Sequence, residues 1–192
     1  MRRGNYDTDD SEMESLIFRP VSLLAASTQR YIEAMFEVLA FVYDNYTNSH
    51  TCPELPTLHR TLNTLGFAPS EVELALLWLE DLKIAAGHLP TRVPCCEPPA
   101  PGAAAMRVLT NSEQAKLGVK GWGLLVFLTA AGALPREELE LVLERALAAP
   151  GDPISLDDLK LLVLMVFWGL AREPDALVLD ELCDNPAERL AQ

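Results

Sequence analysis

The chain has 192 residues, of which 49% are hydrophobic, so it is long enough to bury one sizeable core. Its 28 acidic residues outnumber its 15 basic residues and give a formal net charge of -13. Such a negative field repels phosphate backbones and anionic membrane surfaces unless the basic groups gather on one face. The composition therefore disfavours nucleic acid and membranes as partners.

The cysteines and the N-terminus indicate a protein of the reducing cytoplasm. Cys95 and Cys96 are adjacent in sequence, where a mutual disulfide would be strained, and no disulfide framework is suggested. Arg2 and Arg3 precede acidic residues rather than the apolar segment of an export signal. The longest apolar runs also fall short of the roughly 20 residues that span a bilayer. We therefore expect no signal peptide and no membrane span.

Residues 1–34 form an N-terminal extension before the first clear helical pattern. The first 15 residues are polar and acidic without periodicity, which predicts disorder, and Pro20 is expected to stop a helix from crossing it. From Phe36 to Tyr43, apolar residues recur at the i, i+3, i+4, i+7 spacing of one helical face. This segment is predicted to be a helix.

Two further helices follow closely and complete a three-helix unit over residues 35–84. Pro56 suits the first position of a helix that ends at Gly66, and residues 69–82 restart a helix with an apolar face. The unit is compatible with a helix-turn-helix motif. An ordinary three-helix bundle gives the same pattern and is the favoured interpretation.

Residues 85–105 are expected to be a linker or surface loop, because five prolines among alanine and glycine block regular structure. Residues 106–109 are a candidate for one short strand, such as the wing of a winged helix. Thr110 and Glu113 then form a capping-box pattern that opens a helix.

Further helices are predicted at residues 122–131, 135–148, 156–169 and, with the weakest pattern, 177–190. Ser155 and Asp158 give the third of them a second capping-box pattern. That helix is apolar nearly all round, which is typical of the central helix of a bundle.

The predicted fold is therefore all-α, a compact bundle of about six to seven helices with at most one short strand or wing. Residues 106–192 are expected to form a C-terminal helical unit that packs with residues 35–84 as one body.

Four stretches carry a family resemblance. They are residues 35–39 (Met-Phe-Glu-Val-Leu), 65–82 with its Ala-Leu-Leu-Trp-Leu-Glu run, 121–128 (Gly-Trp-Gly-Leu-Leu-Val-Phe-Leu) and 156–166 with its Leu-Asp-Asp-Leu-Lys run. In order and spacing they closely resemble the Smg family of bacterial proteins. The resemblance implies a small cytoplasmic all-helical protein of unknown biochemical role, whose gene often lies near one for a DNA-processing protein.

The resemblance also has limits along the chain. Smg proteins typically begin at the equivalent of Met35, so residues 1–34 are either a lineage-specific extension or the result of a start codon assigned too early. The proline-rich segment 85–105 has no counterpart in the family.

The chain contains residue types that bind metals or act in catalysis, but their spacing matches no known metal-binding or catalytic motif. His50, Cys52, Cys95 and Cys96 are zinc-ligand types, yet their spacing contains no C-x2-C pair. The histidines lie in or beside loops and suggest no nucleophile–base pair, and no glycine-rich phosphate-binding motif occurs. We predict no catalytic residue, no metal and no cofactor, and hence not an enzyme.

Paired carboxylates and tryptophans have structural explanations. Asp157 and Asp158 lie at a helix N-terminus, where capping and the helix dipole account for them. Trp78, Trp122 and Trp168 are expected in the core, although aromatic residues also anchor interfaces.

Four polar residues remain as candidates for an interaction surface or a polar network: Glu80, Arg107, Arg145 and Lys160. Glu80 and Lys160 lie on otherwise apolar helices. There we expect them to pair with each other or with Arg145 in a half-buried network, or to face a partner.

The leading functional hypothesis is a non-enzymatic helical protein-interaction, or adaptor, protein that binds another protein or a second copy of itself. It rests on the excess of apolar helix surface in a chain with a mean hydropathy of +0.12. The alternative is a nucleic-acid-binding helix-turn-helix-like module linked to DNA processing. Residues 69–82 carry four acidic residues, the wrong charge for a recognition helix. The remaining support for the nucleic-acid-binding alternative is a basic patch of Arg92, Arg107, Lys116 and Lys120.

Overall fold

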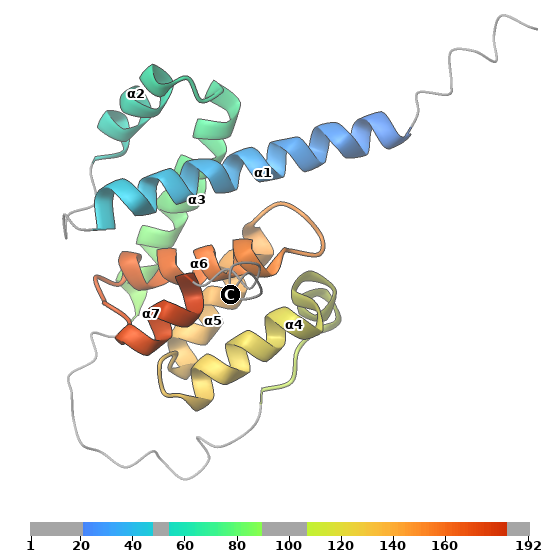
Figure 1. Ribbon diagram of the computed structural model, residues 1–192, viewed down its shortest axis with the longest axis vertical. Helices are drawn as coiled ribbons and strands as arrows, with labels where there is room; N and C mark the ends of the chain where they lie inside the picture. Colours follow the sequence, from blue (N-terminus) through green and yellow to red (C-terminus); the bar gives the residue numbers. More distant parts are fainter. Residues whose placement is uncertain (1–20, 48–53, 90–106, 184–192) are drawn as a thin grey trace, which may run out of the picture.

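The computed structural model describes residues 21–47, 54–89 and 107–183, and within these ranges it contains seven α-helices and no strand (Figure 1). The helices are α1 (Val21–Tyr46), α2 (Leu55–Leu65), α3 (Pro69–His88), α4 (Asn111–Ala130), α5 (Arg136–Ala148), α6 (Leu156–Gly169) and α7 (Ala176–Cys183). The prediction of an all-α fold is confirmed. The disorder predicted for residues 1–15 lies outside the described residues, as does the part of the predicted linker from residue 90 to 105. The linker was predicted to start at residue 85, which is wrong, because residues 85–88 continue α3.

Proline and glycine set the helix boundaries in the first half of the chain. α1 begins at Val21, so residues 21–34 of the predicted N-terminal extension are helical and the helix is longer than the segment predicted from Phe36 to Tyr43. α2 has proline in its first turn and ends at Gly66, whose φ of 95° is left-handed. α3 starts at Pro69, as predicted, but continues past residue 82 to His88.

The predicted strand at residues 106–109 is wrong for the residues that the structure describes. Residues 107–110 have no regular structure and lead directly into α4. A strand needs a neighbouring strand to complete its hydrogen bonds, and the regular elements of the described chain are all helices. Thr110 instead caps α4. Its hydroxyl accepts a hydrogen bond from the Glu113 amide at 3.3 Å, and the Glu113 carboxylate accepts one from the Thr110 amide at 2.7 Å.

α4 is longer than the helix predicted at 122–131 and contains a break. It starts at Asn111 and is interrupted at Gly118, where φ is 61° and ψ is -176°. These angles are accessible essentially only to glycine. The first turns of α4 therefore point away from the second segment, residues 119–130.

The second capping box is only half formed. Ser155 accepts a hydrogen bond from the Asp158 amide at 3.0 Å, but the Asp158 carboxylate accepts from the Ser155 hydroxyl at 2.7 Å rather than from the Ser155 backbone. The motif uses Glu or Gln at this position, and aspartate is one methylene shorter. α6 nevertheless begins and ends where it was predicted.

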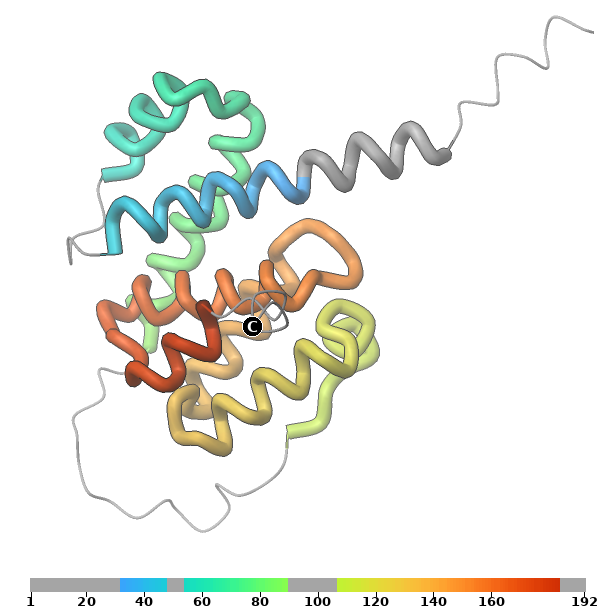
Figure 2. Tube along the Cα trace, in the orientation of Figure 1, coloured from blue at the N-terminus to red at the C-terminus, as the bar shows by residue number. Residues whose placement is uncertain are grey.

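α6 is the central helix of the fold, as predicted. It packs against α1, α3, α4, α5 and α7, and its residues 162–167 are all buried. α1 lies across α3 and α6 (Figure 2). Helices from both sides of residues 90–106 thus contribute to one hydrophobic core. In the part of the chain that the structure describes, no helix is both long and apolar enough to cross a bilayer.

Candidate interaction surfaces

Arg107 joins the entry of α4 to α5. Its guanidinium donates hydrogen bonds to Glu113 at 2.7 and 2.9 Å and to Glu140 at 2.6 and 2.8 Å. The Glu113 side chain is only 7% exposed, whereas that of Glu140 is 46% exposed. Hydrogen bonds from Arg107 lower the pKa of Glu113 from 4.5 to about 2. Arg107, one of the four candidate residues, is therefore part of a structural ion-pair network.

Arg145 is a buried cation at the contact between α3 and α5. Its Nη2 donates to Glu144 at 2.9 Å, and its Nη1 lies 3.5 Å from the Asp81 carboxylate. Its backbone carbonyl accepts a hydrogen bond from the indole of Trp78 at 3.1 Å. Nε and Nη1 of Arg145 have no hydrogen-bond partner within the described residues. The side chain is thus incompletely satisfied, but it lies beneath the surface.

Lys160 and Glu80 lie apart from that site. Lys160 is buried and donates a hydrogen bond to the backbone carbonyl of Glu181 at 2.7 Å, at the C-terminal turn of α7. Glu80 is exposed on α3, and the carboxylate that reaches Arg145 is that of the next residue, Asp81. The structure therefore brings neither Arg145 nor Lys160 to Glu80, and the four candidates do not share one surface.

A buried lysine was missed by sequence reasoning. Lys116 of α4 is 3% exposed and donates hydrogen bonds to the backbone carbonyls of Ala149, at 2.5 Å, and Gly151. Its ammonium also lies 3.2 Å from Asp152. It fastens the α5–α6 connection to α4. Since Arg107 is paired and Lys116 is buried, the expected basic patch loses these two members, while Arg92 lies outside the described residues.

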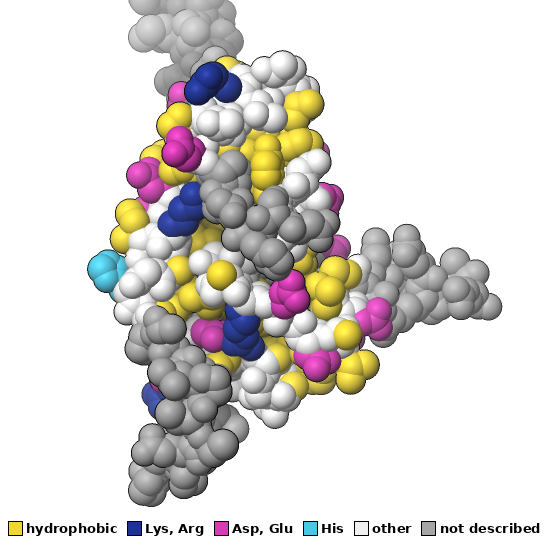
Figure 3. Space-filling view, turned by 90° about the vertical axis from the view of Figure 1, so that its left-hand side faces the viewer, with side chains coloured by type: hydrophobic (Ala, Val, Ile, Leu, Met, Phe, Trp, Pro, Cys, Tyr) yellow, Lys and Arg dark blue, Asp and Glu magenta, His cyan; other side chains and the backbone are white. Residues whose placement is uncertain are grey.

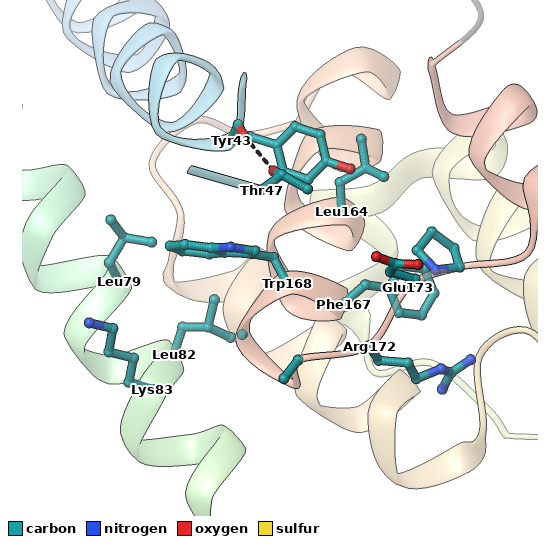
Figure 4. A pocket seen from close by; sticks show the side chains of 13 residues that line it. Tyr43, Thr47, Leu79, Leu82, Lys83, Leu164, Phe167, Trp168, Arg172 and Glu173 are labelled. Atoms are coloured by element: carbon teal, nitrogen blue, oxygen red, sulfur yellow. Dashed lines mark hydrogen bonds between the residues drawn. The ribbon is translucent and has the colours of Figure 1, made fainter. Parts of the chain in front are cut away.

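A hollow of about 660 Å³ lies between α1, α3 and the C-terminal end of α6 (Figure 4). Its apolar lining is Leu79, Leu82, Leu164, Phe167 and Trp168. Trp168 is half-buried here, and Trp122 is also half-buried, so of the three tryptophans only Trp78 lies fully in the core. The volume is within the range of small-molecule sites.

The polar groups around this hollow are mostly engaged elsewhere. Arg172 donates to Glu138 and to the carbonyl of Ala133, and its guanidinium lies 5.0 Å from the centroid of the Phe167 ring. Burial raises the pKa of Tyr43. Lys83 has no ion pair within the described residues. The hollow is thus an apolar recess with one uncommitted cation at its edge.

The second segment of α4 exposes an apolar face to solvent. We call it the α4 face, and it consists of Val119, Trp122, Gly123, Val126, Phe127 and Ala130. Val119 is 91% exposed, Val126 45% and Phe127 52%. At 100° per residue these positions cover an arc of about 140°, directly opposite the buried residues of the same helix.

The α4 face also lacks acidic charge. Residues 114–135 contain neither aspartate nor glutamate, although the chain has 28 acidic residues. Lys120 is exposed beside the face, and Lys116 is turned into the protein. The side of the molecule that lies on the left in Figure 1 is different, because hydrophobic, acidic and basic side chains are mixed there (Figure 3). Sequence reasoning missed this face, since an apolar helix is expected to be buried.

The described residues give no support to a metal site or to the helix-turn-helix interpretation. Among the described residues, no three His, Cys, Asp or Glu side chains are grouped so that they could hold a metal ion. The zinc-type residues His50, Cys52, Cys95 and Cys96 lie outside the described ranges. α2 and α3 are joined by a short turn at Gly66, but α3 exposes Glu73, Glu80 and Asp81.

The seven described helices define an all-α protein in which, among the described residues, the α4 face is exposed. The chain belongs to the DUF494 family, described as proteins of unknown function, whose model matches residues 35–192. It is 42% identical over 157 residues to a protein Smg homolog of Methylibium petroleiphilum, which covers 81% of this chain and 99% of that relative. The Smg homolog of Leptothrix cholodnii is 41% identical with the same coverage.

A more distant relative extends the comparison. The Smg homolog of Bordetella pertussis is 37% identical over 155 residues, which cover 81% of this chain and 98% of that protein. The resemblance to the Smg family is therefore confirmed. No solved structure matches the chain.

Proposed function

We propose that this protein is a non-enzymatic helical interaction protein that binds a partner protein through the α4 face. The observation that carries the proposal is the combination of large exposed apolar side chains and missing acidic charge on one helix. Contiguous exposed apolar surface is typical of protein-binding sites, and aromatic residues are enriched in the centres of interfaces. Phe127 and Trp122 would be the aromatic anchors.

The energetics of the α4 face agree with a binding role. Each square ångström of apolar surface removed from water contributes about 25 cal/mol to the free energy of association. Covering the exposed parts of Val119 and Phe127 would therefore contribute about 2 kcal/mol each. An interface that also covered Val126 would gain a similar increment. The cost of association takes up much of such a sum, so the face fits a reversible contact rather than a permanent one.

A variant pair separates this face from apolar exposure in general. Phe127→Asp places a carboxylate on the α4 face, while Leu77→Asp changes an equally exposed leucine on α3, 60% exposed against 52% for Phe127. Both substitutions are at exposed positions, and each variant is first checked for native helicity by circular dichroism.

The test is affinity purification of the tagged full chain and both variants from the native host after crosslinking in the cell, with and without nuclease. We expect a crosslinked protein, either a different chain or an untagged copy of this one, that survives nuclease, is retained by Leu77→Asp and is lost with Phe127→Asp. Equal retention by both variants would remove the α4 face from the proposal. Recovery that disappears with nuclease would favour nucleic-acid binding over protein binding.

A further inference from the structure

An exposed glycine lies in the middle of the α4 face. A Cβ atom built on Gly123 would meet nothing within 4 Å, so packing within the described part of the chain does not require glycine here. The contrast with Gly121 is direct, because a Cβ at that position would lie 3.0 Å from Leu159. Glycine weakens a helix relative to alanine. Close approach of a second backbone would explain a glycine that the described part of the chain does not need.

Charge indicates what kind of molecule can approach this face. Two copies of a chain with a net charge of -13 repel each other at most orientations. Residues 114–135 contain no acidic residue, and Lys120 is the charged side chain that this segment exposes. A second copy can therefore approach along α4 without placing like carboxylates opposite each other.

We infer that the α4 face binds a second copy of this chain, with the two α4 helices crossing at Gly123. This inference rests on the proposed function and names the partner of the same site. Val119, Gly123 and Phe127 form one i, i+4 ridge, which is the geometry by which helices interlock. A two-fold contact presents the same patch from both copies. The small residue at the crossing point lets the Phe127 ring of each copy pack beside the other helix.

The size of the α4 face sets the expected strength. The face spans residues 119–130 of α4, about 18 Å at 1.5 Å per residue. One crossing of two such helices buries on the order of 300–400 Å² per copy, less than the roughly 800 Å² of a standard stable interface. The dimer is therefore reversible, with a dissociation constant on the order of 10–100 µM.

Sedimentation equilibrium of the full chain over about 5–500 µM tests the inference, because this range brackets the expected constant. The wild type forms a reversible dimer, Phe127→Asp is monomeric throughout, and Leu77→Asp dimerises like the wild type. Val119→Lys, at a position 91% exposed, is a second disrupting variant should Phe127→Asp lose helicity. A monomeric wild type at the highest concentration, or dimers unaffected by both disrupting substitutions, would overturn the inference.

Gly123→Ala distinguishes close helix contact from a merely structural glycine. In dilute solution the substitution raises the midpoint of thermal unfolding by about 2–4 °C, since alanine favours the helix. At high concentration it weakens dimerisation about tenfold, because the added methyl groups separate the helices. A raised midpoint with unchanged dimerisation would contradict the crossing at Gly123.

The outcomes also separate this inference from the proposed function. A monomeric wild type whose affinity-purified partner is lost only with Phe127→Asp refutes the second copy and leaves the α4 face as a site for a different protein. A monomeric wild type with equal partner retention by Phe127→Asp and Leu77→Asp refutes both.

Discussion

Replacing Arg107 with alanine tests whether the network at the start of α4 stabilises the fold. The substitution removes both pairs of hydrogen bonds from the guanidinium and leaves the Glu113 carboxylate, 7% exposed, with the Thr110 amide as its partner. Removing one partner of a buried ion pair costs about 3–5 kcal/mol. The remaining hydrogen bond from Thr110 and the position of Arg107 near the surface reduce the expected loss to about 2–3 kcal/mol.

The stabilisation by Arg107 is expected to depend on pH, and the pKa of Glu113 sets the direction of this dependence. Arg107 lowers the pKa of Glu113 from 4.5 to about 2, so the folded state binds a proton on Glu113 less readily than the unfolded state does. The contribution is therefore fully present above pH 4.5 and is lost as the pH falls toward 2. Solvent near Arg107 screens the pair, and we expect about 1–2 kcal/mol to disappear over this window.

Urea unfolding followed by circular dichroism at pH 7 and at several values down to pH 2.5 measures both effects. The difference in free energy of unfolding between the wild type and Arg107→Ala should shrink as the pH falls. Glu140→Gln is the matched control, because this partner is 46% exposed and its loss should cost at most about 1 kcal/mol. A loss below 1 kcal/mol for Arg107→Ala at pH 7, or a difference that does not change with pH, would show that the pairing of Arg107 with Glu113 does not stabilise the fold.

Three further substitutions address single positions by the same unfolding measurement. Gly118→Ala should destabilise by about 1–3 kcal/mol, because the break in α4 has a φ of 61° that alanine rarely adopts. Ala171→Gly should stabilise by about 0.5 kcal/mol, since relief of a φ of 50° exceeds the entropy that glycine adds to the unfolded chain. Trp78→Phe should cost about 1–3 kcal/mol, because the Arg145 carbonyl loses the indole donor in a buried site; a cost near zero would contradict the importance of that hydrogen bond.

Local signals in the sequence predicted the helix boundaries best. Gly66 ends α2 and the Ser155 cap begins α6, because both effects act within one turn of the chain. The break at Gly118 escaped prediction, since a glycine inside a helical pattern gives no sign of whether it bends the helix. The predicted strand at 106–109 failed because strand formation depends on a neighbouring strand, which local sequence does not reveal.

The surroundings of the polar residues depended on tertiary structure. Glu80 and Asp81 are adjacent, and about 100° of helix rotation decides that Asp81 reaches Arg145 while Glu80 faces solvent. Burial of Lys116 depends on two carbonyls more than 30 residues away. The α4 face was invisible for a related reason, because apolar residues on both sides of a helix do not show which side remains uncovered.

Photo-crosslinking in the native host shows directly whether a protein covers the α4 face in the cell. A photoreactive amino acid is placed at position 127 of α4 or, as the control, at position 77 of α3, both of which are exposed. We expect a discrete crosslinked product from position 127 and none from position 77, at twice the mass of the chain if the partner is a second copy. Illumination that yields no product from position 127, or the same products from both positions, would contradict this expectation.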